Sequence, residues 1–548
     1  MPGAKGAGAD AKTAKSYDLI IVGAGFAGMY MLHKARGIGL SARVFEAGSD
    51  VGGTWFWNRY PGARVDLESQ EYSYSFSEEL EKDWKWTERY SAQPELLAYA
   101  GHVADRFDLR RDISFNTRVV SAVYDDPAGL WRITTDHGET VSARFCIMAT
   151  GCLSAAKTPD IPGAGTFEGE TYSTSEWPPE GVDFTGKKVG IIGTGSSGIQ
   201  TITTIAPQVG ELVVFQRTPN FSVPAHNGPL DPKVRTDWLA NREHYRDMQR
   251  TSGVGILAVD PREDLALEVS PEERRREFEK RWAKGGFCYA AAFRDIGIDR
   301  QANDLLVEFT AEKIRSIVKD PETAERLIPK SYPIGAKRLV VDTGYFEVYN
   351  QDNVTLVDLT ETPIETITKT GIRTSKRDYE FDVIIYAIGF DAMTGALDRI
   401  DIRGRNGRTL REKWAAGPLT YLGLMVSGFP NMFLVTGPGS PSVLSNMLVS
   451  IEQHIDWISG CIHDLGERQV SVIEATPEAE AAWVAHVNEV AAGTLYLQAN
   501  SWYLGANVPG KPRVFMPYVG GVGAYREKCD EVAANDYEGF TLSRVPES

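Results

Sequence analysis

SYDLIIVGAGFAGMYMLHKARGIGLSARVFEA, residues 16–47, decides the fold of this chain. Its apolar start predicts a strand that ends at Gly23, followed by a helix that begins near Gly28 and a second strand that ends at Glu46. Gly23 permits a tight turn, Gly25 lets the backbone approach a pyrophosphate, and Gly28 lets the helix pack closely on the strand. A carboxylate at the position of Glu46 can accept hydrogen bonds from a ribose diol. The stretch therefore predicts a Rossmann unit that binds a dinucleotide.

A second copy of this pattern occupies residues 187–219, where Gly193, Gly195 and Gly198 repeat the glycine spacing. The acidic residue is missing from this copy, and Arg217 stands at the end of its second strand instead. A guanidinium at that position favours a 2′-phosphate, and hence NADP over NAD. Two Rossmann units, one ending in an acid and one in an arginine, imply FAD on the first and NADPH on the second.

The remaining sequence predicts an α/β fold in which two Rossmann-like domains are joined by crossing segments. Residues 144–154 and 380–392 each read as an apolar strand that ends in a glycine turn, as expected where one domain passes the chain to the other. Charged, helix-forming sequence follows Asn227, and Ser270 with Pro271 is a plausible helix start within it. The predicted parts are a disordered tail (1–16), an FAD-binding domain (17–155 and 390–548), an NADP-binding domain (156–226 and 337–389) and an inserted helical subdomain (227–336).

Composition excludes several classes of partner. The 548 residues include 58 basic and 74 acidic ones, a net charge of −16, which argues against nucleic acid as a partner. The five cysteines are widely spaced and form no Cys-x-x-Cys, so neither a disulfide framework nor a metal site is indicated, and a reducing cytoplasm is expected. The N-terminal residues lack the apolar core of a signal peptide. No heptad pattern stands out, so we expect a monomer or a weak homo-oligomer.

Residues 414–451 form a long stretch without charge, which invites comparison with a membrane span. Glycine, proline, serine and asparagine recur through it and would break a spanning helix. We expect this stretch to be buried beside a cofactor or substrate cavity, and we expect no membrane partner.

An enzyme that uses FAD and NADPH belongs either to the disulfide reductases or to the flavin monooxygenases, and the missing cysteine pair argues against the former. Six segments carry a more specific pattern: VGGTWFWNRYPGARVDLES (51–69), GTGSSGIQ (193–200), FQRTP (215–219), IGAKR (334–338), GPGSPS (437–442) and WYLGANVPGKPR (502–513). In these segments, and over nearly its whole length, the chain resembles the type I Baeyer-Villiger monooxygenases, particularly the branch of phenylacetone and steroid monooxygenases.

That resemblance implies an activity. In this family NADPH reduces FAD, the reduced flavin binds O2 as a C4a-peroxide, and the peroxide attacks a ketone to give an ester or lactone. A permanent positive charge beside the reacting oxygen stabilises the anions that form, and arginine supplies it without acting as an ordinary proton donor. By match to the family, Arg338 is the predicted catalytic residue, and Asp66 is the carboxylate that pairs with it and tunes its position.

The resemblance also assigns further cofactor and substrate contacts. Lys337 is expected to bind the 2′-phosphate with Arg217 and Thr218, and Trp502 is expected to touch NADP from a mobile loop. Ser442, Val443 and Leu444 match a bulge beside the substrate, which suggests room for aryl, cyclic or steroid-like ketones. The predicted contacts to FAD are Phe26, Thr54, Trp55, Asp66, Tyr72, Val119 and Met447. The predicted contacts to NADP near the second glycine loop are Thr194, Ser196, Ser197 and Gln200.

FEGETYSTSEWP, residues 167–178, matches a motif of the family in which the position of Ser173 is a histidine. Phe167, Gly169, Trp177 and Pro178 are in register with it. The motif is expected to form a hinge between the domains, where serine can hydrogen-bond but cannot reach as far as histidine or carry its charge. We therefore predict a working enzyme with altered domain coupling, seen as slower flavin reduction or more H2O2.

Two other functions remain open on the sequence. A flavin monooxygenase that oxidises soft nitrogen or sulfur nucleophiles shares the two Rossmann units, although it usually lacks the Trp-Pro pair. A non-enzymatic flavin-binding redox sensor would bind FAD but would show no ketone-stimulated oxygen uptake, and it would leave Arg217, Lys337 and Arg338 without a shared purpose.

Overall fold

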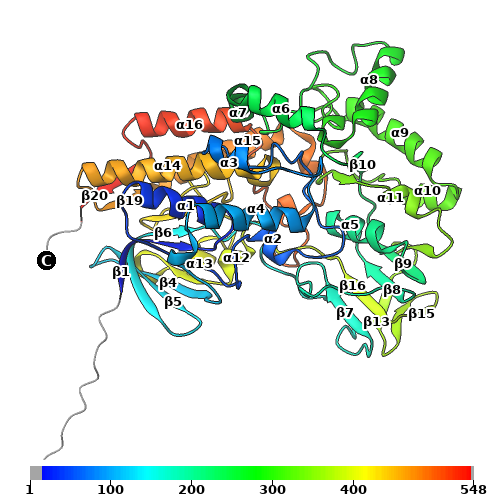
Figure 1. Cartoon of the computed structure of the whole chain (residues 1–548), viewed down its shortest axis with the longest axis horizontal. Coiled ribbons are helices and arrows are strands. Elements are labelled where there is room, and N and C mark those ends of the chain that lie inside the picture. Colours follow the sequence, from blue (N-terminus) through cyan, green and yellow to red (C-terminus); the bar gives the residue numbers. More distant parts are fainter. Residues whose placement is uncertain (1–14, 545–548) are drawn as a thin grey trace, which may run out of the picture.

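A computed structural model describes residues 15–544 of the chain. Figure 1 shows one lobe built from the N-terminal and C-terminal parts of the chain and a second lobe at lower right. Of the helices inserted between them in sequence, α6 and α7 lie beside α16 on the first lobe, and α8 to α10 lie above the second lobe. Each lobe is built on a sheet with parallel strands at its centre. The predicted α/β architecture with two dinucleotide-binding units is confirmed.

The sheet of the first lobe brings together strands from both ends of the chain. Its order is β17 (Asp401–Arg403), β4 (Val119–Asp125), β5 (Leu130–Thr135), β6 (Thr140–Met148), β1 (Ser16–Val22), β2 (Ala42–Phe45) and β3 (Ile113–Ser114), with β18 (Met432–Leu434) also paired to β6. Helix α1 (Phe26–Gly37) connects β1 to β2 and packs against the long helix α14 (Met447–Glu467). The first glycine loop thus lies at the carboxyl end of a central strand.

Two boundaries in this lobe differ from the sequence-based prediction. Helix α1 begins at Phe26 rather than near Gly28, because the extended backbone of Gly25 already provides its N-cap. Strand β1 begins at Ser16, which pairs with Ser142, so the predicted tail of residues 1–16 extends into the sheet. Residues 1–14 of that predicted tail lie outside the described residues.

The sheet of the second lobe is parallel throughout, in the order β12 (Val354–Asp358), β9 (Glu211–Gln216), β8 (Lys188–Ile192), β16 (Val383–Tyr386) and β7 (Glu170–Ser173). Helix α5 (Ser196–Ile205) starts at the second glycine loop. A small antiparallel sheet, β13 (Ile364–Ile367), β14 (Gly371–Thr374) and β15 (Asp378–Glu380), lies between β12 and β16 in the sequence. The second Rossmann unit is therefore formed by two separate stretches of sequence.

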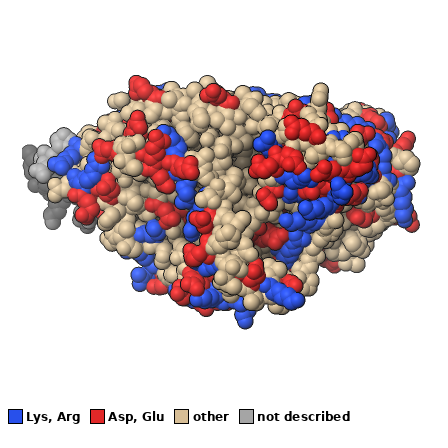
Figure 2. Space-filling model, turned by 90° about the horizontal axis from the view of Figure 1, so that it is seen from above, with Lys and Arg blue, Asp and Glu red and all other residues tan. Residues whose placement is uncertain are grey.

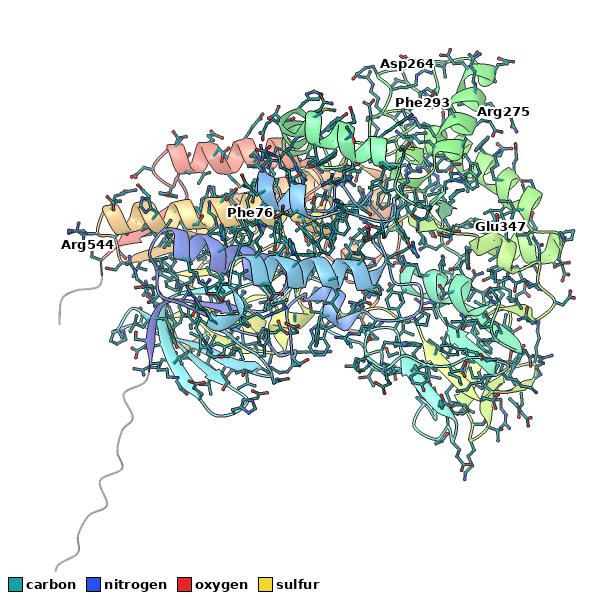
Figure 3. All side chains as sticks on the ribbon, in the orientation of Figure 1. Phe76, Asp264, Arg275, Phe293, Glu347 and Arg544 are labelled. Carbon is teal, nitrogen blue, oxygen red and sulfur yellow. The ribbon has the colours of Figure 1, made fainter. Side chains whose placement is uncertain are left out.

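A group of inserted helices interrupts that unit after β9. It contains α6 (Pro232–Ala240), α7 (Arg242–Thr251), α8 (Pro271–Lys284), α9 (Arg300–Ile317) and α10 (Pro321–Leu327). The predicted helix start is confirmed, because the Ser270 side chain accepts a hydrogen bond from the Glu273 N–H and Pro271 follows it. Figure 3 places Asp264, Phe293 and Arg275 in this group, where Phe293 belongs to a buried cluster. Strand β10 (Ser222–Pro224) pairs with β11 (Val340–Asp342) and closes its base.

The uncharged stretch 414–451 is mostly buried, as predicted, and it contains β18 and the start of α14. No helix within residues 15–544 is long and apolar enough to cross a membrane. In Figure 2 a largely uncharged band crosses the middle of one face, with acidic and basic side chains on either side of it.

Shorter or peripheral elements complete the described chain. These are α2 (Thr54–Trp57), α3 (Glu78–Asp83), α4 (Gln93–Arg106), α11 (Tyr345–Val348), α12 (Gly395–Asp398), α13 (Leu410–Lys413), α15 (Pro477–Ala492), α16 (Val522–Ala534), β19 (Val472–Ala475) and β20 (Phe540–Ser543).

Candidate active site

The glycines of the first loop pack directly against neighbouring backbone atoms. A Cβ atom on Gly28 would lie 1.8 Å from the carbonyl oxygen of Gly23, and one on Gly23 would lie 2.6 Å from the carbonyl oxygen of Ala149. A Cβ on Gly25 would lie 3.3 Å from Cα of Gly53, on a second glycine turn. Since Gly25 has no side chain to cap α1, the first N–H groups of the helix are left to an anionic ligand.

Glu46 lies directly beside this loop. Its carboxylate accepts hydrogen bonds from the Ala24 N–H at 2.7 Å and the Gly48 N–H at 2.6 Å. The residue is 5% exposed, so these two bonds fix a buried carboxylate at the end of β2. The donors occupy one lone pair on each oxygen and leave others for a ribose diol. This buried acceptor, with the uncapped helix, fits the ribose and pyrophosphate of FAD.

Aromatic side chains form a wall next to the same loop. Trp55 donates from Nε1 to the Tyr72 hydroxyl at 3.2 Å, and the two rings meet edge to face. Phe26, the first residue of α1, meets Tyr72 in the same way at 6.1 Å between ring centres. Burial raises the pKa of the Tyr72 hydroxyl, partly offset by the bond from Trp55. Tyr72 is thus a neutral hydrogen-bonding group at neutral pH.

The other predicted FAD contacts lie at the edges of this region. Thr54 is the first residue of α2, on the turn that follows Gly53. Val119 begins β4 and is buried in a cluster with Val22 and Phe45, the last residues of β1 and β2. Met447 begins α14 and packs against the cluster that contains Val443.

The second glycine loop has the same tight packing but a more open centre. A Cβ on Gly193 would lie 2.3 Å from the Ala387 carbonyl oxygen, and one on Gly198 would lie 2.3 Å from that of Gly193. A Cβ on Gly195 would meet nothing within 4 Å. Gly195 caps α5 without a side chain, and Ser196 is the first residue of that helix. An open, uncapped helix N-terminus fits the diphosphate of NADP.

Polar side chains around α5 have specific partners. Thr194 donates to the Thr218 carbonyl at 3.2 Å, and the Ser197 hydroxyl lies 3.0 Å from that of Thr174. Gln200 accepts from the Tyr60 hydroxyl at 2.8 Å and donates to the Arg64 carbonyl at 3.2 Å. The side chain of Gln200 therefore connects α5 to the segment around Asp66, a contact that its predicted role did not include.

Three cations gather near the carboxyl end of the second sheet. Arg217 is exposed at the end of β9. Burial and the charge of Arg217 lower the pKa of Lys337, and the same two causes lower that of Lys157, so both lysines lie within electrostatic reach of Arg217. Within residues 15–544, no carboxylate lies within 4.0 Å of any of the three. Lys157 was not predicted, because its place depends on how the chain crosses between the lobes.

Arg338 and Asp66 meet in a two-pronged ion pair. Arg338 Nε lies 2.9 Å from Asp66 Oδ2, and Nη2 lies 2.8 Å from Oδ1. The third nitrogen, Nη1, donates to the Val443 carbonyl at 3.0 Å. The guanidinium carbon stands 4.5 Å from the centre of the Phe287 ring. All three nitrogens and one face of the guanidinium are therefore used to fix its orientation.

Burial alone would lower the pKa of Arg338, but the charge and hydrogen bonds of Asp66 outweigh it and raise that pKa above its ordinary value. The side chain remains 25% exposed. The guanidinium therefore stays positively charged over the pH range in which the protein is folded, and part of it remains accessible to a ligand.

The segment that contacts Arg338 through Val443 is bent. Ser442 has φ of +40°, a left-handed value that is uncommon for a residue other than glycine, and its hydroxyl donates to the Thr436 carbonyl at 3.1 Å. Ser442, Val443 and Leu444 form a short 3-10 turn. This bend turns the Val443 carbonyl toward the guanidinium, which supports the predicted place of the bulge beside the reaction centre.

Two neighbours of Arg338, Phe287 and Tyr503, were not predicted from the sequence. Phe287 comes from a short 3-10 turn, Gly286–Tyr289, at the base of the inserted helices. Tyr503, next to the predicted Trp502, is buried, which raises the pKa of its hydroxyl, while the charge of Arg338 lowers it. The rings of Trp502 and Tyr503 lie 4.4 Å apart. The approach of Phe287 and Tyr503 to Arg338 joins segments distant in sequence, and no local pattern signals it.

The stretch around Ser173 is not a hinge. It includes β7, the edge strand of the second sheet, with Phe167 and Trp177 packed in hydrophobic clusters of that lobe. The Ser173 hydroxyl lies 2.8 Å from that of Ser175. The prediction of a hinge contact is therefore wrong: the chain enters the second sheet before it reaches this position.

A fold with two dinucleotide sites and a fixed arginine between them defines a flavin- and NADP-dependent oxidoreductase. The profile of the family described as "Pyridine nucleotide-disulphide oxidoreductase" matches residues 20–244. A Baeyer-Villiger monooxygenase of Pseudooceanicola batsensis is 44% identical, with 97% of each chain covered. Phenazine N-monooxygenase PhzNO1 of Lysobacter antibioticus is 42% identical, covering 97% of this chain and 98% of that one.

Among solved structures, oxidized steroid monooxygenase bound to NADP matches with a TM-score of 0.93 and 54% identity, covering 97% of this chain and all of that one. The chain belongs to the Baeyer-Villiger monooxygenase family. Its cofactors are FAD and NADP.

Proposed function

We propose that this enzyme oxidises aryl, cyclic or steroid-like ketones to esters or lactones, with Arg338 as its catalytic residue and Asp66 as the group that holds it. The observation that carries the proposal is the arginine itself, with Asp66, Val443 and Phe287 fixing its orientation. When bound, the FAD takes a hydride from NADPH and activates O2. The residues of the chain then have to stabilise negative charge on oxygen.

Arg338 is suited to that task. Its charge is permanent, so it stabilises an oxyanion without protonating it. Because Asp66 binds Nε and Nη2 and the Val443 carbonyl binds Nη1, the plane of the guanidinium is fixed before any substrate binds. Preorganised donors of this kind act most strongly in a site that excludes water. Tyr72 and Trp55, both buried, line the same region and limit its hydration.

For the cosubstrate, we propose that Arg217, Lys337 and Thr218 bind the 2′-phosphate. The absence of a carboxylate within 4.0 Å of either cation, among the described residues, leaves both charges free for an anion. Lys337 also lies next to Arg338 in the sequence, so a ligand held by the first is close to the backbone that carries the second.

Oxidation of a soft nitrogen or sulfur nucleophile is the second candidate. A relative named for N-oxidation covers the chain as fully as the Baeyer-Villiger relative does. In such a reaction the attacking atom is the substrate's own lone pair, so a permanent cation beside the oxygen has less to stabilise. The Arg338–Asp66 pair therefore favours the ketone reaction.

For the assembly and compartment, we propose a cytoplasmic monomer or weak homo-oligomer. The low cysteine count and the net charge of −16 support a reducing compartment and a soluble chain.

The test follows NADPH consumption by the purified flavoprotein with and without phenylacetone or progesterone, with ester and H2O2 measured in the same vessel. We expect ester to form in step with the NADPH consumed. Oxygenation of a sulfide or amine, with no ester from any ketone, would establish the second candidate instead. Bound FAD without NADPH-dependent oxygen uptake that ketone stimulates would indicate a redox sensor.

A further inference from the structure

The segment 501–512, which we call the Trp502 segment, reaches from the reaction centre to the junction of the two lobes. At one end, Tyr503 lies in a buried cluster with Val443 and Met516. Its carbonyl accepts a hydrogen bond from the Met516 N–H at 2.9 Å. Since Val443 also binds Arg338, the position of this end of the segment affects the surroundings of the guanidinium.

At its other end, the segment lies on the two crossings between the lobes, which pair with each other. Ala156, on the crossing from β6 to β7, forms a β-bridge with Phe390, on the return crossing after β16. The Asp391 N–H donates to the Ala155 carbonyl at 2.9 Å. A shift of the second lobe relative to the first has to pass through this paired junction.

Four polar contacts tie the Trp502 segment to the junction. Lys511 Nζ lies 2.5 Å from Asp391 Oδ1 and 2.8 Å from the Ala392 carbonyl oxygen. Asn507 Nδ2 donates to the Phe390 carbonyl at 2.8 Å, and Lys157 Nζ donates to the Asn507 carbonyl at 2.5 Å. The Lys511 side chain is only 11% exposed, so its ion pair is partly shielded from water.

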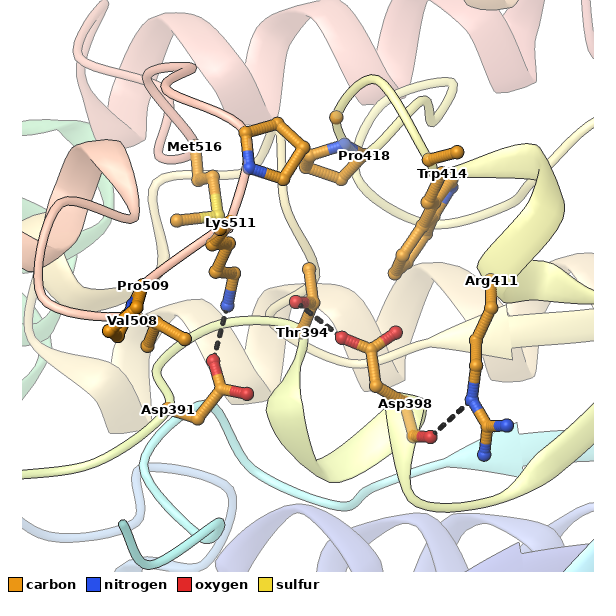
Figure 4. Close-up of a pocket in the computed structure, with 14 residues that line it drawn as sticks. Asp391, Thr394, Asp398, Arg411, Trp414, Pro418, Val508, Pro509, Lys511 and Met516 are labelled. Carbon is orange, nitrogen blue, oxygen red and sulfur yellow. Dashed lines mark hydrogen bonds and ion pairs between the residues drawn. The ribbon is translucent and has the colours of Figure 1, made fainter. Parts of the chain in front are cut away.

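Beside residues 508–512 of the segment there is a cavity that is partly open to solvent. It has a volume of about 340 Å³ and is lined by Val508 to Pro512 on one side and by Thr394, Asp398 and Trp414 on the other. Figure 4 shows the Lys511 side chain directed at Asp391 on one side of the pocket, with Asp398, Arg411 and Trp414 on the opposite side. Apolar packing holds the Tyr503 end of the segment, whereas residues 508–512 line the cavity, so the polar contacts to the junction carry more of the stability of this second end.

We propose that Lys511 and Asp391 are positioning residues for the reaction: their ion pair fixes the Trp502 segment on the junction and thereby keeps Tyr503 and Val443 in place around Arg338. This inference rests on the role proposed above for Arg338. Removing either partner frees the segment to move over the cavity, which loosens the site without disturbing the FAD-binding glycine loop.

The test compares Lys511→Met, Asp391→Asn and the double variant with the conservative Lys511→Arg. Lys313→Met is the matched control, because Lys313 Nζ lies the same 2.5 Å from Glu279 but within the inserted helices. Each holoenzyme is measured for FAD content, for hydrogen exchange of the peptide covering 501–512, and for ester and H2O2 per NADPH.

We expect Lys511→Met and Asp391→Asn each to speed exchange in 501–512 and to lower ester per NADPH by about three- to tenfold, with FAD content unchanged. The double variant should be no worse than either single one, because both remove the same contact. Lys511→Arg should retain most of the coupling, and Lys313→Met should match the parent.

Unchanged exchange and coupling in both single variants would overturn the proposal. So would a loss of FAD or faster exchange over the whole chain, since either would mean a general structural role. If the parent enzyme itself makes no ester, the proposed function fails, and the exchange of 501–512 still decides whether the ion pair holds the segment.

Discussion

The two glycine loops of this chain share one backbone design and differ in what surrounds it. The first is closed: Gly25 abuts Gly53, and the Glu46 carboxylate is buried with a backbone donor on each oxygen. The second is open: Gly195 faces free space, and Arg217 is exposed. A preorganised, closed site suits a cofactor that stays bound, whereas an open cationic one suits a cosubstrate that has to leave in each cycle.

The largest effect on stability is expected at Gly28, in the tightly packed part that the two glycine loops have in common, and not at Gly195, in the open centre of the second loop. Gly28→Ala places a methyl group 1.8 Å from the Gly23 carbonyl oxygen, so we expect destabilisation by more than about 4 kcal/mol and no soluble flavoprotein. Gly195→Ala meets no protein atom within 4 Å, so the variant should fold and retain FAD, and only NADP binding should weaken. Yield, flavin absorbance and NADP titration measure both. A soluble, yellow Gly28→Ala protein would contradict the packing argument.

The next effect concerns the closed site alone. Glu46→Gln directs an amide NH2 at one of the two backbone donors, which leaves a buried N–H without an acceptor at a cost of about 1 to 3 kcal/mol. We expect weaker FAD retention on gel filtration and a lower melting temperature that excess FAD restores. Glu139→Gln, at an exposed position just before β6, is the control. Full FAD retention by Glu46→Gln would argue against its ribose-binding role.

Removing a cation from the second glycine loop's site should weaken NADPH binding about as much as Glu46→Gln weakens FAD binding, and should leave FAD binding nearly unchanged. Each charge-assisted bond to a phosphate is worth about 1.5 to 3 kcal/mol, so Arg217→Ala should raise KM for NADPH about 10- to 100-fold and that for NADH far less. Because the charge of Arg217 contributes to the lowered pKa of Lys337, the variant should also raise that pKa. NADPH affinity falls as pH rises, because Lys337 loses its charge. In the variant this fall should occur at a higher pH. Equal effects on both cosubstrates would rule out the 2′-phosphate contact.

The sequence predicted the two sites unequally for a physical reason. Gly23, Gly28 and Glu46 act within one strand-helix-strand unit, so their spacing alone predicts their roles. Phe287 and Lys157 reach Arg338 and Arg217 only because the inserted helices and the crossings return to the site, and no local spacing encodes that. The Arg338–Asp66 pair joins residues 272 positions apart and was predicted from family resemblance, not from periodicity.

The Ser173 stretch shows the same limit on a smaller scale. The stretch was predicted to form a hinge between the domains, but strand pairing with Tyr386 places Ser173 in the edge strand of the second sheet. We therefore expect the smallest effect here: Ser173→His should change ester per NADPH by no more than about twofold, the value of one weak hydrogen bond. Parallel ester and H2O2 assays measure it. A much larger gain in coupling would support the original view of this position as a link between domains.

The measurement that tests the central claim most directly is ester and H2O2 formation by Arg338→Ala and Arg338→Lys in the presence of ketone and NADPH. If Arg338 stabilises the anionic oxygen, ester formation should fall at least about 100-fold in Arg338→Ala while FAD stays bound and the O2 consumed appears as H2O2. Arg338→Lys keeps the charge but loses the two-pronged contact with Asp66, and should recover only part of the activity. Ester formation by Arg338→Ala within a few-fold of the parent would contradict the account.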